Sequence, residues 1–124
     1  MTEPGPTFTL EEANAALPEL RERLARIRAA RQELIRSSER IRGRVAVDGG
    51  GHDGRDYFES VAVLKAEIQR LAVEGILLRD PETGLVDFPA ELDGRRVFLC
   101  WRLGEDNVAF WHDVDSGFGG RRPL

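Results

Sequence analysis

The segment 111–121, with the sequence WHDVDSGFGGR, holds the densest group of side chains that could do chemistry. It contains a histidine, two aspartates, two aromatic residues, three glycines and an arginine. One imidazole with two or three carboxylates is a ligand set that suits iron, manganese or zinc. We therefore take His112, Asp113 and Asp115 as candidate ligands of a divalent metal. The spacing matches no known metal-binding signature, so other roles stay open.

Asp87 and Glu105 complete the acidic part of this candidate site, because both are expected in or beside the same sheet. Glu105 is also explained as a turn residue. Strand alternation puts His112 on the same side as Phe110, which we expect to face the helices. A buried ring nitrogen without a partner costs about 1–3 kcal/mol, so His112 needs one. The expected partners are the carboxylates of Asp87 or of the second helix; proton transfer is a further alternative.

The glycine-rich end of the segment has a second interpretation. Glycines let consecutive backbone N–H groups converge, and Arg121 adds a charged fork, so residues 117–121 could hold a carboxylate or phosphate. Alternatively, Phe118 fills the core while the glycines turn the chain around it. Arg121 then pairs with Asp87 or Asp115, and the segment closes the sheet as a polar clasp.

The sequence offers no credible catalytic residues. Cys100 lies between Leu99 and Trp101 in a predicted strand and is expected to be a buried, inert thiol. Ser116, His112 and Asp113 lie too close together on one strand end to form a Ser–His–Asp triad. His52 lies in a glycine-rich loop, where we expect it to be exposed. The sequence therefore favours a protein that is not an enzyme.

Residues 8–75 are expected to form an antiparallel, coiled-coil-like helical hairpin. TLEE at 9–12 is a capping box that starts a short helix from Leu10 to about Ala16, and Pro18 predicts a kink or restart. Apolar residues then follow a heptad alternation from Leu20. The turn VDGGGHDG at 47–54 ends this pattern, and a second helix begins near Asp56. That helix also has a second apolar stripe, which either the rest of the chain or a second copy must cover; it holds Phe58, Val63, Ala66 and Val73.

Residues 76–124 are expected to form a small antiparallel sheet of two β-hairpins. The first joins 76–79 to 85–88, and Pro89 ends its second strand. The second joins 96–103 to 108–112 through a four-residue turn, which would place Leu99 beside His112. The sequence therefore predicts an α+β fold.

The bulk properties predict one domain over residues 1–124. The chain has 124 residues, of which 41% are hydrophobic, a net charge of −4 and one cysteine. The single cysteine excludes an internal disulfide, and no secretory signal or membrane-spanning stretch precedes the first helix, so we expect a cytoplasmic protein without a membrane partner. Residues 19–45 hold nine arginines against four glutamates, but the acidic total disfavours a nucleic-acid partner.

Three phrases carry a family resemblance. FTLEEANAALPEL at 8–20, GLVDFPAELDGRRVFLCWRLGE at 84–105 and FWHDVDSGFGGRRPL at 110–124 resemble the small bacterial family called domain of unknown function 2203. The resemblance covers nearly the whole chain. It implies a small bacterial protein and supplies no catalytic residues.

Three functions follow as expectations. The leading one is a non-catalytic binding or assembly module that forms a homo-oligomer through the second helix. The alternative is a metal-binding protein or metal-dependent enzyme centred on His112. A third is RNA or ribosome association through the arginine-rich helix, which would weaken steeply as salt rises.

Overall fold

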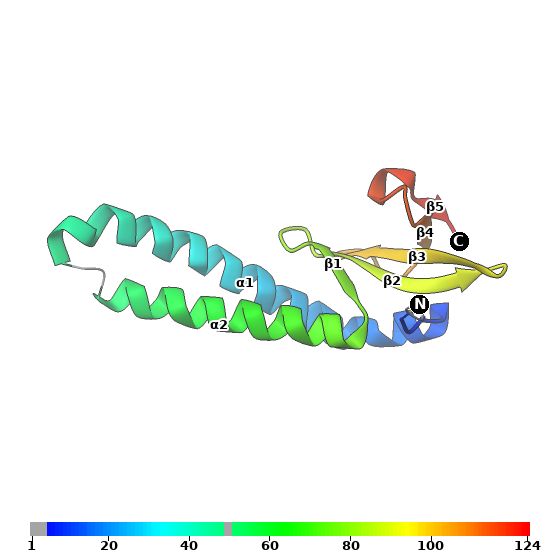
Figure 1. The fold of residues 1–124 in the computed structure, drawn as a ribbon, viewed down its shortest axis with the longest axis horizontal. Helices are drawn as coiled ribbons and strands as arrows, with labels where there is room; N and C mark the ends of the chain where they lie inside the picture. The colour runs from blue at the N-terminus through cyan, green and yellow to red at the C-terminus, as the bar shows by residue number, and fades with distance from the viewer. Residues whose placement is uncertain (1–4, 49–50) are drawn as a thin grey trace.

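Two long helices form a hairpin, and a five-stranded antiparallel sheet follows them (Figure 1). The computed structural model describes residues 5–48 and 51–124, with the backbone alone for 44–48 and 51–53. The helices are α1 (Leu10–Asp48) and α2 (Gly51–Glu74). The strands lie in chain order across the sheet: β1 (Leu77–Asp80), β2 (Leu85–Leu92), β3 (Arg95–Arg102), β4 (Phe110–Asp113) and β5 (Arg122–Pro123), with a 3-10 helix η1 (Phe118–Gly120) before β5. The predicted α+β class is confirmed.

Helix α1 begins at the predicted capping box. The backbone N–H of Thr9 donates to Glu12 Oε1 at 2.8 Å, and the N–H of Glu12 donates to Thr9 Oγ1 at 3.0 Å. The predicted restart at Pro18, and with it the end of a short first helix near Ala16, is wrong, because α1 continues through Pro18. An interior proline costs about 3 kcal/mol. Leu17 and Leu20 on either side of it are buried, each worth about 1.5–3 kcal/mol, and this packing holds the helix together.

The two helices come closer in sequence than predicted. Helix α1 continues to Asp48 and α2 begins at Gly51, rather than near Asp56. The rest of the predicted turn at 47–54, including the side chain of His52, lies outside the described residues. Helix α2 ends at Glu74, and Gly75 follows with φ of 86°, the left-handed conformation of a helix C-cap.

Strand β2 does not end at Pro89, as predicted, but continues to Leu92 and pairs along its length with β3. Strand β1 pairs only with the first part of β2, so no strand lies beside Pro89 on that side. The backbone N–H that proline lacks is therefore not needed there. There the carbonyl of Pro89 instead accepts from the backbone N–H of Phe8 at 2.7 Å. The tight turn between β2 and β3 uses Asp93 and Gly94, both at positive φ.

The predicted pairing of β3 with β4 is wrong by one residue. His112 pairs with Phe98, and Leu99 pairs with Trp111, because the connection between the strands is longer than a four-residue turn. A shift of one residue moves every side chain to the other face. His112 therefore lies on the side of the sheet away from the helices, together with Phe98.

The core lies between the helices and one face of the sheet. The N-terminal half of α1 crosses under that face, and its buried side chains pack with Leu71 of α2 and Trp101 of β3. Beyond the sheet the two helices continue as a projecting pair, seen at the left of Figure 1. We call this part, residues 31–43 and 54–66, the helical arm. The segment between β4 and β5, which contains η1 and which we call the C-terminal segment, lies on the side of the sheet away from the helices.

Candidate functional site

The sheet face turned away from the helices carries a small cavity, of about 370 Å³. It lies between strands β1 to β4 and the C-terminal segment. The fold thus places the polar side chains of the sheet against those of the glycine-rich segment. Its lining includes Arg79, Asp87, Cys100, His112, Asp115 and Phe118. Three of these side chains, Asp87, Cys100 and His112, are at least 98% buried at its base.

His112 is held through both ring nitrogens. Its Nδ1 lies 2.7 Å from the carbonyl oxygen of Asp113, and its Nε2 lies 3.0 Å from Asp87 Oδ1. A carbonyl oxygen only accepts, so Nδ1 carries a proton. A hydrogen bond between Nε2 and Asp87 requires a second proton between them. The expectation that a carboxylate holds His112 is confirmed, and Asp87 is that carboxylate.

Arg79 ties down the other side of Asp87. Its Nε donates to Asp87 Oδ2 at 2.8 Å, and its guanidinium lies 5.1 Å from the centre of the Phe98 ring. The register of β1 against β2 shifts between Leu78 and Asp80, so Arg79 sits at an irregularity of the edge strand. Both oxygens of the buried carboxylate thus have cationic or N–H partners.

Cys100 joins this pair, which the sequence did not predict. Its Sγ, a carboxylate oxygen of Asp87 and a ring nitrogen of His112 all lie within 4.8 Å of one another. Burial, followed by the negative charge of Asp87, raises the pKa of the Cys100 thiol to about 12. The expected burial of this thiol is confirmed, and because the thiolate is the nucleophile, the raised pKa disfavours reaction with electrophiles.

Arg121 pairs with Glu105, not with Asp87 or Asp115. Its Nη2 donates to the two carboxylate oxygens of Glu105 at 2.7 and 2.9 Å, and to the carbonyl of Cys100 at 3.3 Å. Burial opposes ionisation of Glu105, but hydrogen bonds from Arg121 and from the backbone of Arg102 hold its pKa below the ordinary value. The carboxylate of the β3–β4 connection therefore fixes the C-terminal segment.

Phe118 does not fill the core. Its side chain is exposed, and the guanidinium groups of Arg121 and Arg102 lie 4.7 and 5.3 Å from its ring centre. Arg121 also stacks at 4.1 Å over Phe110. Such cation–π contacts cover the outer aromatic residues in place of a helix layer. Arg121 thus contacts a carboxylate through Nη2 and stacks on two rings, while its buried Nε has no hydrogen-bond partner.

The other predicted ligands of His112 lie elsewhere. The carboxylate of Asp113 pairs with Arg95 at 3.1 Å, while its carbonyl faces His112. Asp115 is exposed at the rim of the cavity. In the part of the chain that the structure describes, the group with metal-ligand spacing is Asp87, Cys100 and His112. Asp87 and His112 belong to the candidate site that the sequence suggested, and Cys100 does not.

Reasoning from sequence missed Cys100 and Arg79 for a specific reason. Asp87 and Cys100 are directly paired across β2 and β3, and this pairing follows from the β-hairpin turn at Asp93 and Gly94. The dipeptide Asp-Gly between two apolar runs is a strong hairpin signal. Taking Pro89 as the end of the strand hid that signal, and with it the neighbour of Cys100.

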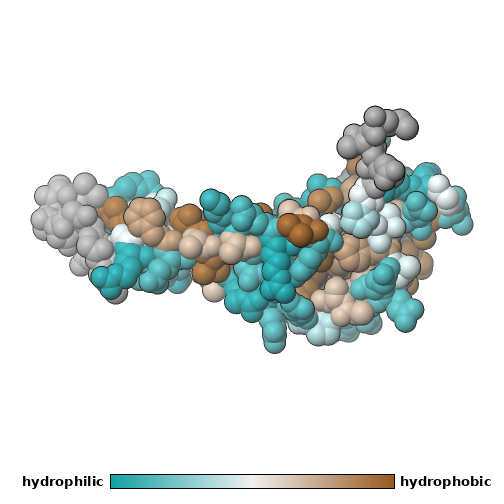
Figure 2. All heavy atoms as spheres, turned by 60° about the horizontal axis from the view of Figure 1, so that its bottom comes forward, coloured by the Kyte–Doolittle hydropathy of each residue, from teal (hydrophilic) through white to brown (hydrophobic). Residues whose placement is uncertain are grey.

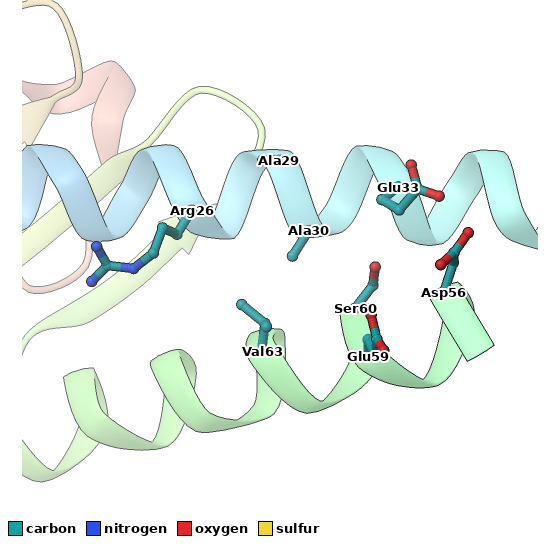
Figure 3. A pocket seen from close by; sticks show the side chains of 8 residues that line it. All are labelled: Arg26, Ala29, Ala30, Glu33, Asp56, Glu59, Ser60 and Val63. Carbon is teal, nitrogen blue, oxygen red and sulfur yellow. The ribbon is translucent and has the colours of Figure 1, made fainter.

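A second hollow lies between the two helices of the arm. It has a volume of about 610 Å³, and Figure 3 shows Ala30 and Val63 pointing towards each other across it, with Arg26 at one end and the carboxylates of Glu33, Asp56 and Glu59 at the other. Hydrogen bonds from Arg36, Ser37 and Arg40 lower the pKa of Glu33 to about 2. Glu33 is therefore part of the arm's ion-pair network rather than a member of an acid–base pair.

Comparisons with known proteins support the family resemblance that the sequence suggested. In the described residues, no helix is long and apolar enough to cross a membrane. No curated protein and no solved structure gives a significant match. A family model described as "Uncharacterized conserved protein (DUF2203)" matches residues 6–124, nearly the full chain. The chain therefore belongs to the DUF2203 family.

Proposed function

We propose that this chain is a cytoplasmic, non-catalytic assembly module that forms a homodimer through the outward side of α2. The observation that carries the proposal is a row of exposed residues on that helix. We call it the outer stripe: Phe58, Ala62, Ala66, Gln69 and Val73. Phe58 and Val73 at its ends are 72% and 86% exposed.

The stripe has the spacing of a helix–helix contact. Its residues follow each other at intervals of four, four, three and four, which places them on one side of a helix. Ser60 and Leu71 are buried, so the opposite side of α2 faces α1. Figure 2, in which the lower side of Figure 1 comes forward, shows a row of apolar residues along the helices between polar ones. A helix with apolar residues on two sides calls for a second partner.

A second copy fits this stripe when the two α2 helices run antiparallel. A two-fold axis near Ala66 brings Phe58 of each copy against Val73 of the other, and Ala62 against Gln69. The small side chains at the centre let the helices approach closely, and the large ones at the ends cover each other. The contact is isologous, so a dimer uses the stripe of both copies and leaves neither stripe free to bind a third copy.

Charges beside the stripe agree with the same arrangement. Glu59 and Arg70 flank it on one side, and the antiparallel axis brings Glu59 of each copy near Arg70 of the other. In a parallel dimer, Glu59 of one copy would lie level with Glu59 of the other and far along the helix from Arg70, so these pairs would not form. Arg70 already contacts Glu19 at 2.6 Å, but both side chains are about half exposed, and exposed pairs contribute little.

The paired arginines of α1 favour assembly over RNA binding. RNA binding would need unpaired positive charge along the helix. Instead, Arg23 contacts Glu67 and Glu74, with the shorter distance 2.7 Å. Further α1 arginines contact carboxylates or carbonyls of the chain itself: Arg21, Arg26, Arg28, Arg31, Arg36 and Arg40.

Sedimentation equilibrium over a range of concentrations tests the proposal. We expect wild type to dimerise, and Phe58→Ala and Val73→Ala each to weaken the dimer about 100-fold. Two-fold symmetry removes each contact twice, at about 1.5 kcal/mol apiece. Ile35→Ala is the matched control, because Ile35 is an exposed apolar residue of α1 outside the stripe. A wild-type chain that stays monomeric at every concentration would end the proposal.

Charge reversal tests the antiparallel orientation. Glu59→Arg and Arg70→Glu should each weaken the dimer, because each places like charges side by side. The double variant should restore it, since both intermolecular pairs are rebuilt with exchanged signs. A double variant weaker than both single variants would exclude this pairing.

A further inference from the structure

We propose that Asp87, Cys100 and His112 form a zinc site at the base of the outer cavity. This inference goes beyond assembly and concerns the opposite side of the molecule. The three side chains come from three adjacent strands, β2, β3 and β4, and are directly or diagonally paired across the sheet. They supply one oxygen, one sulfur and one nitrogen ligand.

The distances are close to those of a tetrahedral zinc site. Zinc lies about 2.0–2.1 Å from nitrogen and oxygen ligands and about 2.3 Å from sulfur, so ligand atoms stand about 3.3–3.6 Å apart. His112 Nε2 and Asp87 Oδ1 are 3.0 Å apart and need only separate slightly. Cys100 Sγ lies within 4.8 Å of the other two ligand atoms, so it must move by about 1.5 Å at most.

The surroundings of His112 and Asp87 already orient them as ligands. A zinc-bound histidine usually donates its other ring N–H to a carbonyl or carboxylate. Nδ1 of His112 does so to the carbonyl of Asp113, which leaves Nε2 directed at the site. Arg79 holds Asp87 Oδ2 at 2.8 Å and leaves Oδ1 directed at Nε2.

Charge balance allows a dication in this buried place. Without metal, one proton on Nδ1 and one shared between Nε2 and Asp87 satisfy the hydrogen bonds of His112, and with the thiol of Cys100 the three groups carry no net charge. Zinc would displace two protons, one from Sγ and one from between Nε2 and Oδ1. The dication, thiolate, carboxylate and neutral imidazole again sum to zero, so binding adds no buried charge.

The ligand set selects zinc over the hard cations. A thiolate with an imidazole suits zinc, whereas magnesium and calcium take oxygen ligands. Three protein ligands leave a fourth position, which structural zinc sites fill with a fourth side chain. Here the three ligands line the cavity, so water or a small ligand would take that position.

Cobalt provides a direct test, because it replaces zinc and reports sulfur ligation by a thiolate-to-cobalt charge-transfer band. The full chain, without a histidine tag, would be stripped with chelator and titrated with Co²⁺ and then Zn²⁺. We expect one equivalent of Co²⁺ to give the band and Zn²⁺ to abolish it. Cys100 is the chain's only cysteine, so the band can come from no other residue.

Variants identify the ligands. Cys100→Ser should lose the band, and Asp87→Asn should weaken Zn²⁺ binding by more than about 100-fold, since even an outer partner is worth about 10–100-fold. Asp113→Asn and His52→Ala are matched controls, whose affinity for Zn²⁺ should stay within about twofold of that of wild type. No band from wild type, or a band that survives Cys100→Ser, overturns the proposal. Circular dichroism of each metal-free variant separates a lost ligand from a lost fold.

Discussion

At the scale of single residues, two carboxylates and their hydrogen-bond donors determine the arrangement of the outer face of the sheet. Asp87 is buried between Arg79 and His112, and Glu105 is bound by Arg121. A buried carboxylate is stable only with such donors, because its desolvation otherwise costs several kcal/mol. The two pairs thus leave Arg121 holding the C-terminal segment and Asp87 facing the cavity.

The pair of Glu105 and Arg121 gives a pH-dependent prediction. The pKa of Glu105 lies below its ordinary value of 4.5, so its contribution to stability is present above pH 4.5 and is lost as pH falls through the lowered value. Glu105→Gln should therefore reduce the free energy of unfolding by about 2 kcal/mol at pH 7. Urea denaturation should show this difference shrinking as pH falls below 4.5 and through the lowered pKa of Glu105.

The exposed Glu91 on β2 supplies the control for this experiment. Glu91→Gln should change stability by less than about 0.5 kcal/mol over the same pH range. A Glu105→Gln deficit that is equally large at pH 7 and pH 3 would show that lost packing, not the ion pair, is responsible.

At the scale of elements, local signals were predictable and the long-range register was not. The capping box at Thr9 and Glu12 depends on four consecutive residues, and the structure forms it as predicted. Asp87, the partner of His112, was also among the alternatives expected from the sequence. Its face of the sheet was not, because a longer connection between β3 and β4 shifts the register by one residue. Cys100 was missed for another reason: taking Pro89 as the end of the strand hid the Asp-Gly turn that pairs Asp87 with Cys100.

Two glycines in the hairpin turns separate backbone strain from steric contact. Gly84 and Gly94 have similar positive φ values, 73° and 76°. A Cβ at Gly84 would lie 2.7 Å from Cβ of Leu103, whereas one at Gly94 would meet nothing within 4 Å. Gly94→Ala should therefore cost about 1–2 kcal/mol from the left-handed backbone alone.

Gly84→Ala should cost clearly more, by about 1–3 kcal/mol, because β2 and the β3–β4 connection must also move apart. Urea denaturation of the two variants gives both values, and their difference isolates the contact with Leu103. Equal losses for the two variants would mean that the connection yields freely at this point.

At the scale of the whole molecule, stability is concentrated at one end. The buried apolar residues pack between α1, the end of α2 and the sheet, from Ala13 to Val108. In the described part of the helical arm no apolar side chain is buried, and the buried residues there are Ser37 and Ser60. A helix pair with so little apolar burial gains most from a second copy laid along it.

Hydrogen exchange should therefore detect both the low local stability of the helical arm and its protection by a second copy. At low protein concentration, amides of the helical arm should exchange faster than those of β2 and β3, because local opening there exposes little apolar surface. As the concentration rises through the dimerisation range, protection of α2 should increase, while that of β2 and β3 stays constant. The Phe58→Ala variant should keep the fast exchange over the same range. Protection of the arm equal to that of the sheet in the dilute monomer would show that two helices suffice, and the reason for assembly would then be lost.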